Sequence, residues 1–212
     1  MSSSHRRSLP LNWIIVATSL RFVVVQLDGT VVTARCNHEV SGERLPQYTV
    51  MPHTEALRKQ LADFIDFGEA HATAESAMAE LDIDLQGKRP TGLKHSPWEI
   101  LEHIRITQHD ILEFCRNSSY EEMKWPDDYW PRSAAPPSDD SWRKSVAHFE
   151  TDRNALRAIA KDKSTHLFAT IPHGTGQTYL RELLVAQDHL SYHVGQLVAV
   201  RQLLGAWHVA KK

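Results

Sequence analysis

Apolar side chains recur every three to four residues through most of the chain after residue 50, and this period predicts amphipathic helices. Runs rich in glycine and proline divide the pattern into four helical segments. Their expected bounds are residues 54–87, 97–115, 138–162 and 180–207. Four helices of this length indicate an all-α fold, a four-helix bundle of the up-down type with a long loop between the second and third helices.

The helix ends are predicted from capping and helix-breaking residues. Thr54 is a suitable N-cap for the first helix, which Gly87 ends. Ser96, Pro97 and Glu99 supply an N-cap, a proline at the first helical position and an acid in the first turn. The second helix is therefore expected to begin at Pro97.

The loop between the second and third helices contains the run WPDDYWPRSAAPPSDD. It holds too many prolines for a helix or a central strand, and it is rich in aromatic residues. Loops of this length often cover a site. Trp125, Tyr129 and Trp130 are therefore expected either to line the mouth of a cavity or simply to anchor the loop.

The first fifty residues lack the helical period. The run LNWIIVATSLRFVVVQLDGTVVTARC is rich in β-branched residues, and Asp28-Gly29 between two apolar stretches is typical of a hairpin turn. The segment is thus either a β-hairpin or disordered. A further interpretation, which we favour, is that Met51 is the natural start and the preceding residues are a translated upstream extension. The expected division is an extension over residues 1–50 and a bundle over residues 51–212.

Composition and charge exclude several classes of function. The chain has 24 basic and 26 acidic residues, a formal charge of −2 and no long run of either sign, so we expect no nucleic-acid or membrane partner. Arg6 and Arg7 precede an apolar stretch, as in a signal peptide, but Arg21 interrupts it and no clear cleavage site follows. Cys36 and Cys115 form neither a disulfide framework nor a zinc knuckle. A cytoplasmic location fits best.

The last predicted helix carries His189 and His193, which are four residues apart and therefore project from one face. The same face includes aliphatic residues, so the histidines are not on an obviously solvated side. Either each imidazole finds a hydrogen-bond partner in the core, or the pair binds a metal ion. The complete line of residues on this face is Val185, His189, His193, Gln196, Val200 and Leu203.

His103, in the middle of the second helix, is the candidate third ligand. By itself it is better explained as a hydrogen-bonded core histidine. In a bundle, however, it can converge with the pair on the last helix, and three imidazoles leave a zinc-like ion one open position for water or substrate.

Two further residues are candidates for a catalytic role. Gln196 lies one turn beyond His193, where it can bind the metal's water or make a simple interhelical hydrogen bond. Asp110 lies two turns beyond His103 and can orient an imidazole, act as a base, or pair on the helix surface with a residue such as Arg105.

The chain at this point resembles the DinB-like superfamily of helical-bundle proteins, which includes the YfiT-type metal-dependent hydrolases. The resemblance rests on a helix-two histidine in SPWEILEHIRITQHD, a long loop, and DHLSYHVGQLVAVRQLLGAW. Its most specific part is D-H-x-x-x-H-x-G-Q followed by R-x-L-L-G. It extends from about Thr54 to Trp207 and leaves the first fifty residues unmatched.

The resemblance implies a divalent metal ion, zinc first and otherwise nickel, manganese or iron, bound by His103, His189 and His193. Some members of the superfamily use the metal to bind a low-molecular-weight thiol in S-transfer or isomerase reactions. The first functional hypothesis is therefore an enzyme that activates a small thiol or water, as a thiol S-transferase or a hydrolase acting on a small molecule. The second is a non-enzymatic metal-binding stress-response protein. Such a bundle can also pair with a second copy of itself to form a homodimer.

Overall fold

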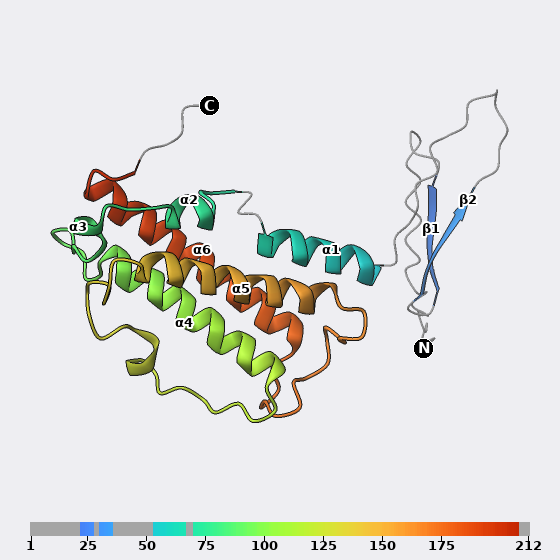
Figure 1. The fold of residues 1–212 in the computed structure, drawn as a ribbon. Helices are drawn as coiled ribbons and strands as arrows, with labels where there is room; N and C mark the ends of the chain where they lie inside the picture. The colour runs from blue at the N-terminus through green and yellow to red at the C-terminus, as the bar shows by residue number, and fades with distance from the viewer. Residues whose placement is uncertain (1–21, 28–29, 36–52, 67–69, 208–212) are drawn as a thin grey trace, which may run out of the picture. The chain divides into compact units, whose positions relative to one another are not determined.

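The computed structural model of this chain describes residues 22–27, 30–35, 53–66 and 70–207 (Figure 1). The chain divides into two compact units, Met1–Thr49 and Val50–Lys212.

The N-terminal unit contains two antiparallel strands, β1 (Phe22–Leu27) and β2 (Thr30–Arg35). The register pairs Leu27 with Thr30, so two residues separate the strands. The strand pair follows from the β-branched run, whereas the Asp28-Gly29 turn expected between the strands lies outside the described residues. The proposed start at Met51 stays a prediction.

The second unit is helical, which confirms the all-α class expected for it. Its α-helices are α1 (His53–Asp66), α2 (Ala74–Met78), α3 (Ile83–Gln86), α4 (Pro97–Arg116), α5 (Ser141–Lys161) and α6 (Tyr179–Leu203), with a 3₁₀ turn, η1, over Asp127–Tyr129. None of the helices that the structure describes is long and apolar enough to cross a membrane.

The prediction of one helix over residues 54–87 is wrong. Three helices, α1 to α3, occupy this stretch, because internal residues cap new helices. The Thr73 hydroxyl accepts from Ser76 N at the start of α2, and the Asp82 carboxylate accepts from Asp84 N at the start of α3. The apolar residues on the two sides of the first break pack into different core clusters, Leu61, Ala62 and Ile65 of α1 into one and Ala74, Ala77 and Met78 of α2 into the other.

Helix α4 begins where the sequence indicates. The Ser96 hydroxyl accepts from Glu99 N at 3.2 Å while the Glu99 carboxylate accepts from Ser96 N at 2.8 Å, which is a complete capping box. The Ser96 hydroxyl also donates to the Ala134 carbonyl at 2.5 Å. The start of α4 is thereby tied to the long loop after it.

Helix α4 packs against α5 and α6, and α1 packs against the same two helices (Figure 1). Side-chain hydrogen bonds join α4 to α5 at residue pairs 102 and 145, 108 and 149, and 109 and 152. Because the residue numbers of the bonded pairs increase in the same direction along both helices, α4 and α5 run parallel. The predicted up-down order is therefore wrong for α4 and α5, because the long loop returns the chain to the end of the bundle at which α4 began.

Helix α6 crosses the core with Leu190, Val194, Leu197 and Val200 buried. Leu203, expected on the same inner face, is 62% exposed, because it is the last residue of α6. The buried part of α6 thus extends through the turns that carry the two histidines.

Candidate metal centre

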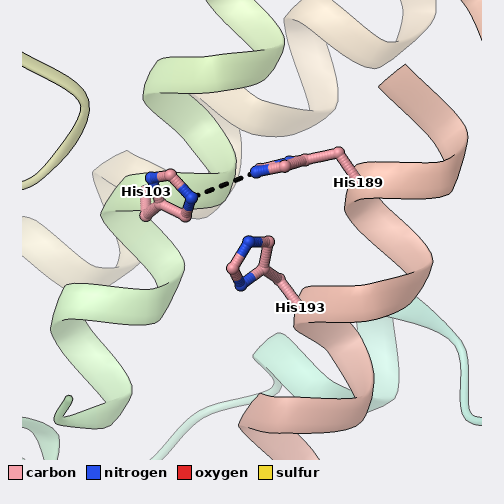
Figure 2. Close-up of side chains that lie close together, drawn as sticks. All are labelled: His103, His189 and His193. Carbon is pink, nitrogen blue, oxygen red and sulfur yellow. Dashed lines mark hydrogen bonds between the residues drawn. The ribbon is translucent and has the colours of Figure 1, made fainter. Parts of the chain in front are cut away.

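Three histidines from two helices converge inside the helical unit. His103 lies on α4 and His189 and His193 lie on consecutive turns of α6, and all three rings point into the space between these helices (Figure 2). One nitrogen from each ring can be chosen so that all three lie within 4.8 Å of one another. The structure therefore brings together the three residues predicted as metal ligands.

The spacing of the ring nitrogens fits a shared metal ion. His103 Nε2 and His189 Nε2 are 3.1 Å apart (Figure 2). Two imidazole nitrogens that both bind a tetrahedral zinc ion at about 2.0–2.1 Å are separated by roughly 3.3 Å. The His103–His189 pair is thus already close to the separation that zinc requires.

Hydrogen bonds outside the cluster fix which nitrogen of two rings carries the proton. His103 Nδ1–H donates to the Tyr129 carbonyl oxygen at 2.8 Å, and His193 Nδ1–H donates to Gln196 Oε1 at 2.8 Å. Because both acceptors bind Nδ1–H, each neutral ring carries its lone pair on Nε2, the atom that a metal would bind, and the Nε2 of His103 accepts from His189 Nε2–H.

Burial keeps the three imidazoles neutral. Only 2% of His103 and 7% of His193 is exposed, and His189 is partly buried. Burial, reinforced by the neighbouring imidazoles, lowers the pKa of His189 to about 3 and that of His193 to about 4. The pKa of His103 is lowered chiefly by burial, and its bond to Tyr129 opposes this. Neutral imidazole is the form that binds metals, so the donor set fits a divalent ion.

The long loop covers one face of the cluster. The Trp130 ring stacks on His103 with centroids 3.9 Å apart and an angle of 5° between the planes. The other face of Trp130 stacks on His95, also at 3.9 Å. Of the three loop aromatics singled out from the sequence, Tyr129 and Trp130 therefore contact His103, whereas Trp125 is 68% exposed.

Asp110 and Gln196, the candidate catalytic residues, lie in different settings. Gln196 binds His193 within the same helix. The Asp110 oxygens accept from the Tyr120 hydroxyl at 2.9 Å and the Tyr129 hydroxyl at 2.7 Å. The expected surface partner, Arg105, instead pairs with Glu102.

The sequence does not predict two contacts of the three-histidine cluster. The Tyr129 carbonyl is a backbone group, which every residue carries, so the sequence holds no signal for its role. His95 has no histidine three or four residues away that would mark it as a ligand, and its contact with the site passes through Trp130.

One of three comparisons with known proteins identifies a family for this chain. The DinB superfamily matches residues 66–197, more than half of the chain and the part that contains all three histidines. Searches of curated proteins and of solved structures each found no match. From the extent of the family match, the chain belongs to the DinB superfamily.

Proposed function

We propose that this protein is a metal-dependent enzyme that activates a small thiol or water for attack on an electrophilic small molecule, as a thiol S-transferase or a hydrolase. His103, His189 and His193 would hold the divalent ion. The observation that supports the proposal is the convergence of three neutral imidazoles within 4.8 Å, two of them with their protons directed outward.

The donor set favours zinc, with nickel, manganese and iron as alternatives, since zinc accepts both imidazole nitrogen and thiolate sulfur. A divalent ion bound by three neutral ligands keeps its full positive charge and lowers the pKa of a bound thiol or water. The residues of the chain supply the rest. Tyr129 and Gln196 orient two rings, and the stacked Trp130 keeps solvent from one face of His103.

The thiol in this proposal comes from outside the protein. Cys115 is 4% exposed, and burial raises the pKa of its thiol to about 12, so it is an inert core residue rather than a nucleophile. A low-molecular-weight thiol is therefore the co-substrate of the transferase version. The free Cys115 thiol is also compatible with a reducing, cytoplasmic location, which is part of this proposal.

The metal site is tested by elemental analysis of the purified full-length protein. One divalent ion per chain is expected, and His189→Ala should lose most of it because a three-ligand set becomes a two-ligand set. His71→Ala is the matched control, since His71 is exposed and its hydrogen bond within the described part of the chain goes to the neighbouring Ala72 carbonyl. Equal metal content in wild type and His189→Ala would contradict the assignment.

The chemistry is tested by screening the zinc-loaded protein with small thiols against electrophilic substrates. Turnover is expected to disappear in His193→Ala and to persist in Cys115→Ala. Turnover with water and no thiol would select the hydrolase version. Turnover that requires Cys115 but not the metal would overturn the mechanism.

One observation favours the non-enzymatic alternative, a metal-binding stress-response protein. Both oxygens of Asp110, the candidate acid or base, already accept from tyrosine hydroxyls. Stoichiometric metal without turnover for any thiol or substrate class would support this alternative.

A further inference from the structure

Tyr129 is bonded at two points to a single helix. Its carbonyl oxygen accepts from His103 Nδ1–H at 2.8 Å, and its hydroxyl donates to Asp110 Oδ2 at 2.7 Å. His103 and Asp110 are seven residues apart on α4, two turns along one face. The side chain and backbone of Tyr129 therefore bridge two turns of the helix that presents the metal ligand.

Asp110 also binds a second residue of the same loop. Its other oxygen accepts from the Tyr120 hydroxyl at 2.9 Å. Tyr120 and Tyr129 both belong to the segment between α4 and α5. The Asp110 carboxylate on α4 therefore binds this segment at two residues. Burial and the neighbouring carboxylate raise the pKa of both phenols, which keeps the hydroxyls protonated and able to donate.

Trp130, which follows Tyr129, is the second loop residue that contacts His103. Trp130 stacks on the imidazole at 3.9 Å and is itself backed by His95. The Tyr129 carbonyl fixes the proton on Nδ1, and the Trp130 ring restrains the plane of the imidazole. Two adjacent loop residues thus restrain both the tautomer and the ring plane of one ligand.

We infer that Asp110 and Tyr129 are positioning residues for the metal ligand His103, with Asp110 acting through the Tyr129 hydroxyl to hold the Tyr129 carbonyl against the imidazole. The inference rests on the proposed metal site and gives Asp110 a role other than that of an acid or base. Hydrogen-bond partners of metal-bound histidines typically change metal affinity by about 10–100-fold when removed.

The chain offers a matched pair of variants. Tyr129→Phe and Tyr120→Phe each remove one hydroxyl from the same carboxylate, but only Tyr129 also binds His103. In full-length protein, zinc affinity measured by chelator competition should fall about 10–100-fold in Tyr129→Phe and by less than about 3-fold in Tyr120→Phe. Asp110→Ala should weaken zinc binding at least as much as Tyr129→Phe, and Asp110→Asn, which keeps one acceptor oxygen, should recover part of the loss.

Two spectroscopic measurements separate positioning from general stability. The visible absorption bands of bound Co²⁺ should shift in Tyr129→Phe and stay unchanged in Tyr120→Phe, with circular dichroism confirming that both variants fold. In the metal-free protein, long-range ¹H–¹⁵N spectra should show His103 protonated on Nδ1 in wild type and in mixed tautomers in Tyr129→Phe.

The outcomes distinguish this inference from the proposed function. If wild type binds zinc and Tyr129→Phe matches it in affinity, Co²⁺ spectrum and tautomer, the positioning role is overturned. Equal losses in the two tyrosine variants would also overturn it, because they would indicate loosening of the whole loop. If wild type binds no zinc but the tautomer still changes in Tyr129→Phe, the metal proposal fails and the positioning of His103 stands.

Discussion

The side chain of Gln196 lies one helical turn beyond His193, and its amide oxygen accepts a hydrogen bond from His193 Nδ1–H. A histidine ligand needs such an acceptor because a neutral imidazole has one N–H, and that N–H must point away from the metal. The i, i+3 spacing brings the two side chains together without any contribution from another helix. Gln196 is thus the local counterpart of the Tyr129 carbonyl, which reaches His103 from a distant loop.

Replacing Gln196 by alanine should weaken zinc binding about 10-fold or more, because the Nδ1 proton of His193 loses its acceptor. The change should be visible in the same chelator-competition titration. Gln202→Ala, an exposed glutamine six residues later on α6, serves as control and should bind zinc like wild type. Identical affinities in the two variants would show that Gln196 does not orient His193.

At this scale the sequence predicts the three clustered histidines better than their surroundings. The i, i+4 spacing of His189 and His193 is visible in the sequence because both residues lie on one helix. His103 could be added only as a candidate, and the resemblance to a family was needed to select it over a hydrogen-bonded core histidine. The bonds of Asp110 to two tyrosines could not be predicted, since they depend on the path of a proline-rich loop.

Among the elements, α4 has the strongest local signals and its predicted start is confirmed. Ser96, Pro97 and Glu99 are each suited to one position of a helix N-terminus, and the capping box forms as expected. The stretch from α1 to α3 lacks such agreement. There, an alanine-rich apolar period predicts one continuous helix. Thr73 and Asp82 nevertheless cap two separate helices, and the period gives no sign of these breaks.

The Ser96 hydroxyl stabilises two elements, since it caps α4 and donates to the Ala134 carbonyl. Ser96→Ala should therefore lower the free energy of unfolding by about 2 kcal/mol, roughly 1 from the cap and roughly 1 from the loop bond. Thr178→Ala is a suitable comparison because Thr178 caps α6 through Arg181 N, and it should cost about 1 kcal/mol. Urea denaturation of both variants measures the difference, and equal losses would show that the Ala134 bond contributes nothing.

On the scale of the whole molecule, the chain separates after Thr49 into an N-terminal unit and a helical unit. The helical unit contains the capping residues, the core and all three histidines. In the sequence, β-branched residues give way to a helical period near Met51, and the division into residues 1–50 and 51–212 stays a prediction. Which end of the bundle the chain returns to after α4 could not be predicted, since a loop of that length allows either direction.

A protein that starts at Met51 should stay soluble, keep its helical circular dichroism and bind zinc with the affinity of the full chain. The reason is that, among the residues that the structure describes, both core clusters and the three clustered histidines lie in the helical unit. Thermal unfolding and zinc titration of the two lengths provide the comparison. Unfolding of the shorter protein, or loss of its metal, would mean that the first fifty residues are an integral part of the domain.

His103 and His189 are 86 residues apart along the chain, yet their Nε2 atoms lie 3.1 Å apart. Closing a flexible loop of that length costs about 4 kcal/mol of chain entropy. In this fold the closure is achieved by the packing of α4 against α6 through apolar residues on both sides of the cluster, and not by the imidazoles. An ion bound by the proposed site would therefore meet three histidines already gathered. Its binding energy would not be spent on folding the chain, in contrast to small zinc domains that are unfolded without metal.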